Sequence, residues 1–241
     1  MAAFGGYPQN VTFSTVNVAK GGGSENLLIN PRGKINQLNE PDGVLSAGVY
    51  FCDGWKAGTS GAEVYRDADG FRLISGSIVQ LVPNNLGAGR NLRANMDTIS
   101  GSPVMSINGG SDNVVSSDSE YISLEISGNN SKFNRTILAE SLEIPIYQQS
   151  SNELERCEWF VQKISGMFIE GNSLGSGFYV TESITKKPIG NVAVSYSLNG
   201  SQNLWLIEMV DKGSTLNVFV RSSGAGRVFA DISNIVLDAR P

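Results

Sequence analysis

Residues 215–221 read TLNVFVR, and this stretch decides the fold class. Leu216, Val218 and Val220 recur at every second position, so they would share one face of an extended strand. Residues 192–198 repeat the alternation. Short alternating runs that end in turn residues are typical of antiparallel sheets with one buried face.

Turn residues separate these runs. The segment Asp67–Gly70 lies between two apolar runs and predicts a hairpin loop, as does the pair Asn199–Gly200. The first loop does not fit the EF-hand calcium pattern, because Phe71 and Ile78 occupy positions that need oxygen ligands. The sequence therefore predicts an all-β fold, an antiparallel two-sheet β-sandwich of the jelly-roll type.

Two parts of the chain differ in composition. Residues 1–25 end in a glycine-rich joint and are expected to form an extended N-terminal anchoring arm. Residues 26–241 are expected to form the jelly-roll domain, and whether they hold one sandwich or two stays open. Within this domain, residues 136–143 are the expected helix, and residues 203–210, apolar on both faces, are expected to form a central strand.

Buried positions are also suggested by residue type. Trp55, Trp159 and Trp205 lie in apolar alternating contexts, so core packing is expected for all three. Cys52 and Cys157 are too few for a disulfide framework, and free buried thiols are expected, although spacing alone does not exclude that they pair.

Composition excludes several function classes. The 241 residues include no histidine, which excludes Ser-His-Asp and Cys-His catalysis and histidine-ligated metals. A net charge of −5 with scattered lysines argues against nucleic-acid binding. No apolar run reaches the roughly 18 residues of a membrane helix, and residues 1–10 lack the pattern of a signal peptide, so no membrane insertion is expected.

No catalytic or metal site is expected either. Carboxylates are numerous, but none stands in a catalytic motif, so we expect a protein without enzymatic activity, metal or cofactor. Aromatic rings near loops are suited to stacking on sugar rings, while amides and carboxylates bind the hydroxyl groups. Tyr65, Tyr147 and Tyr179 each lie near a loop and are the candidates for a glycan platform.

The arm carries more apolar side chains than a solvated tail requires. Its candidate anchoring residues are Phe4, Tyr7, Val11 and Phe13. A frayed terminus is the alternative interpretation.

The opening of the predicted domain resembles that of bacteriophage tail-fibre and virion-surface proteins. Residues 25–33 read ENLLINPRG, and residues 47–56 read AGVYFCDGWK. The family shows a similar N-L-L-I-N stretch followed by a Y-x-x-D-x-W signature. Position 54 is Gly where the family often has Arg. The residues that carry the likeness are Asn26, Leu27, Leu28, Ile29, Asn30, Asp53 and Trp55.

The resemblance covers the two ends of the domain, because residues 228–238 are similar to a closing strand of such jelly rolls. It implies a carbohydrate-binding jelly roll in a structural protein of the virion surface, assembled in the host cytoplasm, with homotrimerisation by family habit. The first hypothesis is a tail-fibre or receptor-binding subunit that recognises host-surface glycan. The alternative is a capsid decoration or head-fibre protein attached by its arm. Both make other virion proteins its partners.

Overall fold

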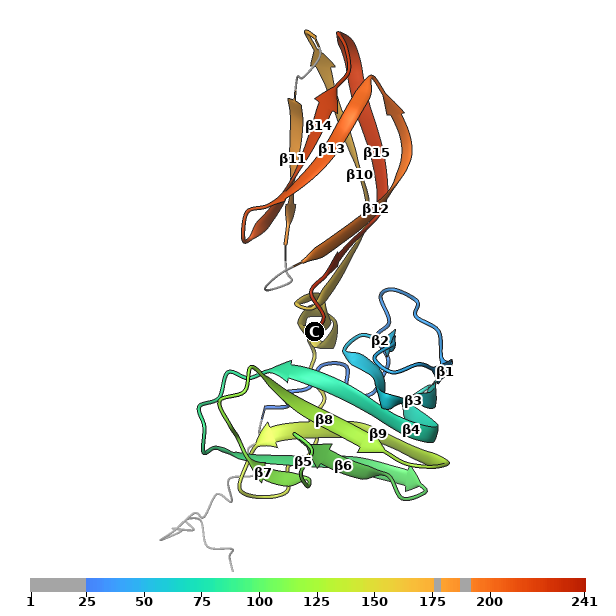
Figure 1. The fold of residues 1–241 in the computed structure, drawn as a ribbon, viewed down its shortest axis with the longest axis vertical. Helices are drawn as coiled ribbons and strands as arrows, with labels where there is room; N and C mark the ends of the chain where they lie inside the picture. Colours follow the sequence, from blue (N-terminus) through green and yellow to red (C-terminus); the bar gives the residue numbers. More distant parts are fainter. Residues whose placement is uncertain (1–24, 176–178, 187–191) are drawn as a thin grey trace, which may run out of the picture.

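The structure is a computed structural model that describes residues 25–175, 179–186 and 192–241. Within these ranges the chain forms fifteen β-strands and one short helix, and its sheets are antiparallel (Figure 1). The predicted all-β, sandwich-like class is therefore confirmed. The strands divide into a first unit, β1–β9, and a second unit, β10–β15, which are stacked along the long axis of the molecule.

The first unit is one nine-stranded sheet folded over itself. Strand β4 is the corner: its first half pairs with β9 and its second half with β8, while β3 lies along its other edge. Gly76 at the corner has φ +82°, and a Cβ there would lie 2.3 Å from the Gly61 carbonyl oxygen, so only glycine fits. The strands are β1 (Gly43–Leu45), β2 (Tyr50–Cys52), β3 (Trp55–Asp67), β4 (Gly70–Pro83), β5 (Asn91–Ser100), β6 (Val104–Ile107), β7 (Asn113–Val115), β8 (Tyr121–Ser127) and β9 (Ser131–Glu140).

The second unit packs two three-stranded sheets face to face, in the orders β10-β15-β12 and β11-β14-β13. Leu216, Val218 and Val220 on β14 are buried between the sheets, as the alternation predicts. Its strands are β10 (Val161–Ser173), β11 (Tyr179–Thr185), β12 (Ala193–Gln202), β13 (Leu204–Asp211), β14 (Thr215–Ser222) and β15 (Gly226–Asp238).

Each unit has its own hydrophobic core. The first centres on Trp55, Phe71 and Phe133, whose rings contact one another at centroid distances of 5.2 and 5.7 Å. The second lies between the two sheets of β10–β15. The range 26–241, for which we expected one jelly-roll domain, thus contains two separate core clusters.

Four local predictions are wrong. The pair Asn199–Gly200 forms no hairpin loop, because it lies within β12 at a register shift against β15. The helix expected over residues 136–143 does not form. Residues 136–140 end strand β9, because four consecutive residues from Thr136 are buried in the first unit and residues 137–140 pair with β5. The helix of the described chain is α1 (Glu153–Glu158). Strand β13 lies at a sheet edge, not at its centre. Two of the three tryptophans expected in the core are exposed: Trp205 on β13 is 66% exposed, and Trp159, after α1, is 47% exposed. Trp55 is fully buried, as predicted.

The two units are joined by two neighbouring segments. The chain leaves the first unit through α1 and enters β10, and it returns from β15 beside this exit, where the Ala239 N–H donates to the Phe160 carbonyl at 2.8 Å. The returning end is held by Arg240, whose side chain is 7% exposed and pairs with Glu40 at 2.7 Å and Asp238 at 2.8 Å. Arg240 also lies over the Tyr50 ring, 4.1 Å from its centroid.

Candidate functional site

The opening segment, residues 25–30, crosses the first unit and belongs to no strand. Its backbone is nonetheless paired: the Leu27 N–H donates to the Leu138 carbonyl at 2.8 Å. The Asn26 amide extends this pairing, because it donates to the Thr136 carbonyl at 2.9 Å and accepts from the Leu28 and Leu138 N–H groups at 3.1 Å. Asn26 therefore ties the segment to β9.

A glutamine completes the pairing of this segment on its other side. The Gln80 side chain, 1% exposed, accepts from the Ile29 N–H at 2.8 Å and donates to the Ile29 carbonyl at 3.0 Å. The amide thus takes the place of a neighbouring strand for one residue. Sequence reasoning missed Gln80; a lone Gln facing the core side of a strand was the available signal.

The remaining motif residues form a buried polar cluster beneath the segment. Asn30, with φ 46°, donates to the carbonyls of Ile35 at 2.7 Å and Asp53 at 3.1 Å, and its own carbonyl accepts from the Trp55 indole at 3.0 Å. The Asp53 carboxylate accepts twice from Gln37, through its N–H at 2.8 Å and its side-chain amide at 2.7 Å. The motif residues therefore lie together, and their contacts hold the fold.

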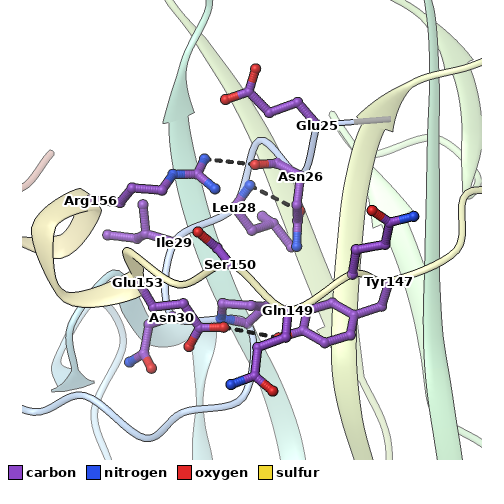
Figure 2. Close-up of a pocket in the computed structure, with 12 residues that line it drawn as sticks. Glu25, Asn26, Leu28, Ile29, Asn30, Tyr147, Gln149, Ser150, Glu153 and Arg156 are labelled. Carbon is purple, nitrogen blue, oxygen red and sulfur yellow. Dashed lines mark hydrogen bonds between the residues drawn. The ribbon is translucent and has the colours of Figure 1, made fainter. Parts of the chain in front are cut away.

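A pocket of about 260 Å³ opens beside this segment (Figure 2). One wall is the opening segment, and the other is the extended chain after β9 together with α1. Both walls contribute polar side chains. The lining residues are Glu25, Asn26, Leu28, Ile29, Asn30, Pro31, Tyr147, Gln148, Gln149, Ser150, Glu153 and Arg156.

Tyr147 is the aromatic group of this pocket. Its ring is half-buried, and its hydroxyl donates to the Glu153 carboxylate at 2.9 Å (Figure 2). Burial and this hydrogen bond raise the pKa of Tyr147 to about 12, so the phenol is neutral and stays a donor at physiological pH. Opposite Glu153, the Arg156 guanidinium donates to the Asn26 carbonyl at 2.6 Å, which joins α1 to the opening segment.

Arg32 fixes the outer rim of the pocket. It donates to the Gln149 side-chain oxygen at 3.0 Å and forms a 2.5 Å ion pair with Asp69, which the guanidinium keeps ionised by lowering the pKa of that carboxyl. The arrangement offers one ring face and several amide, hydroxyl and carboxylate groups within a small volume. Such a set can bind a polar ring compound without any metal or nucleophile.

The three candidate tyrosines lie on different elements. Tyr65 is on β3, where its hydroxyl donates to Glu63 at 3.1 Å and Arg72 covers its ring at 4.7 Å. Tyr179 begins β11 in the second unit and pairs with Arg221 of β14. Of the three, Tyr147 alone lines the pocket with the motif residues.

Other predictions have mixed outcomes. The arm candidates Phe4, Tyr7, Val11 and Phe13 lie outside the described residues. Cys52 and Cys157 are buried free thiols, as expected. Residues 67–70 form the predicted hairpin turn between β3 and β4.

The residues that the structure describes contain no group of three or more Cys, Asp or Glu side chains placed to hold a metal ion. Within the same ranges, every helix is too short or too polar to cross a membrane. A scan against protein-family models and searches of the curated proteins and of the solved structures found no match to this chain.

Proposed function

We propose that this chain is a bacteriophage virion-surface protein, a tail-fibre or receptor-binding subunit, that binds host-surface glycan in the Tyr147 pocket. Its sandwich would be a carbohydrate-binding jelly roll, and its N-terminal arm would attach it to other virion proteins. The observation that carries the glycan proposal is the pocket itself, which places an aromatic ring among hydrogen-bonding side chains.

The pocket suits one sugar ring at the end of a glycan. Its volume of about 260 Å³ lies just below the roughly 300 Å³ at which sites for drug-sized ligands begin. The Tyr147 ring offers a face for C–H groups, while Gln148, Ser150 and Glu153 offer both donors and acceptors for hydroxyl groups. Glu25 and Glu153 offset the charge of Arg156, which favours a neutral sugar over an acidic one.

The likeness at the start of the domain supports the virion assignment. Its polar residues bond within the first unit: Asn26 bonds to β9, and Asn30 links Asp53 to Trp55. A motif whose members all hold the fold is the kind of signature that related domains would share, because its loss would disrupt the scaffold beneath the pocket.

A glycan array with the full chain tests the binding function. We expect retention of a small set of neutral glycans, loss of that signal in Tyr147→Ala, and partial retention in Tyr147→Phe, which keeps the ring but not the hydroxyl. Tyr65→Ala is the matched control and should bind as wild type. An empty array, or equal binding by Tyr147→Ala and wild type, would contradict the proposal.

Quantitative mass spectrometry of purified virions tests the location. A copy number far below that of the major capsid protein is expected for a tail protein. A simple whole-number ratio to capsid subunits would instead identify a capsid decoration protein, and absence from virions would reject both.

A further inference from the structure

An apolar cleft of about 580 Å³ lies at the junction of the two units and shares Glu25, Ile29 and Arg156 with the Tyr147 pocket. Side chains from the first unit, from the opening segment and from the two segments that connect the units form its walls. Most of them are aliphatic or aromatic. The lining residues are Glu25, Leu27, Ile29, Val82, Pro83, Asn85, Leu86, Tyr121, Ile122, Arg156, Trp159, Phe160, Ala239 and Pro241.

Trp159 makes this cleft unusual. It lines the cleft yet keeps 47% of its surface exposed, and a concave apolar surface with an exposed indole is typical of a site that binds another apolar group. Leu86, which also lines it, is only partly buried against the first core.

The N-terminal segment meets the described structure at this cleft. Residues 1–24 directly precede Glu25, which lines this cleft as well as the Tyr147 pocket. These 24 residues contain no Asp or Glu and a single charged side chain, Lys20. Their apolar side chains include Val11 and Phe13, which alternate with polar residues as one-sided extended segments do.

We propose that the cleft is the docking site for residues 1–24 of the same chain, with Val11 and Phe13 packed against Trp159. The reach is sufficient, because the twelve residue steps from Phe13 to Glu25 span up to about 40 Å when extended. Three consecutive glycines, Gly21 to Gly23, let the chain reverse direction just before the cleft.

Docking would hold the arm on its own chain before it engages another protein. An arm packed in the cleft cannot at the same time insert into a neighbouring virion protein, so assembly would have to displace it. This inference does not depend on glycan binding or on the tail location.

Trp159 provides a direct reporter. In a full-length Trp205→Phe background, Trp159 is the one remaining exposed indole, because Trp55 is fully buried. We expect weak acrylamide quenching of this protein, and a severalfold increase with a red-shifted emission when Val11→Ser and Phe13→Ser are introduced together.

The matched control changes polar neighbours in the same stretch, Thr12→Ala and Ser14→Ala, and should quench like the parent. Equal quenching of the parent and of the Val11→Ser, Phe13→Ser variant would overturn the proposal. Protection that disappears on dilution would also overturn it, because a second copy would then be the occupant.

Crosslinking gives an independent measurement. A full-length variant with Phe13→Cys and Leu86→Cys should form a disulfide within the monomer, while Cys52 and Cys157 remain buried and unreactive. A disulfide found only in covalent dimers, or no disulfide at all, would contradict docking within one chain.

Discussion

Replacing Gln80 tests whether one side chain substitutes for a strand. Gln80→Leu keeps the approximate volume but removes both partners of Ile29, whose N–H and carbonyl bond the amide at 2.8 and 3.0 Å. Ile29 is only 7% exposed, so water cannot restore these bonds easily. Each buried backbone group left without a partner costs about 1–3 kcal/mol, so we expect the free energy of unfolding to fall by about 2–6 kcal/mol.

Urea unfolding measures this loss. Trp55, next to the cluster, reports on the first unit when Trp159→Phe and Trp205→Phe remove the other two indoles. Gln148→Leu, at an exposed glutamine, is the matched control and should change stability by less than about 0.5 kcal/mol. A loss below about 1 kcal/mol in Gln80→Leu would refute the reasoning, because it would mean that Ile29 finds other partners.

Gln80→Glu separates donor from acceptor at the same position. The introduced acid can donate to the Ile29 carbonyl only when protonated, so folding should raise its pKa above the ordinary value of about 4.3. The folded state then binds the proton more tightly, and stability should be near wild type below about pH 4 and fall as the pH rises toward about 7. If the difference in the free energy of unfolding between Gln80→Glu and wild type did not change across this pH range, the assigned hydrogen bond to the Ile29 carbonyl would be contradicted.

Three further predictions concern Glu40, Gly76 and the two cysteines. Burial raises the pKa of Glu40 above its ordinary 4.5, and the bond from Arg240 partly opposes this rise. Arg240→Met should therefore raise the pKa of Glu40 further. The urea midpoint of this variant should fall more steeply than that of wild type as the pH rises above 4.5. Gly76→Ala should destabilise the first unit by several kcal/mol, because the added Cβ meets a backbone oxygen at 2.3 Å, and an unchanged melting temperature would disprove this. Cys52 and Cys157 are buried, so a thiol reagent should label neither in the native protein and both after denaturation, whereas labelling of native protein would contradict their burial.

Period-two alternation predicts the strands where one face is buried, as on β14. It fails at residues 136–140, because a strand buried on both faces has no alternation and resembles a short apolar helix. The same pattern misplaces β13. A strand with apolar side chains on both faces can lie at the centre of a sheet or at its edge, and only the strand order decides between them.

The site shows the same limit. Tyr147 could be selected from its position near a loop, but its partner Glu153 lies on a helix that the sequence did not indicate. The roles of Gln80 and Gln37 are harder to predict from the sequence. Their hydrogen-bond partners are 51 and 16 residues away, and no local pattern distinguishes these glutamines from others. Long-range hydrogen bonds of this kind depend on the topology, which local pattern does not contain.

The double connection between the units has a mechanical consequence. A module on a single linker swivels freely, but here the outgoing segment at Val161 and the returning segment at Asp238 run side by side as paired strands. Arg240 then clamps the returning segment to Glu40 of the first unit. Because two chains cross the junction, rotation about a single backbone bond cannot turn one unit relative to the other. Any relative rotation must distort the paired strands or separate Arg240 from Glu40.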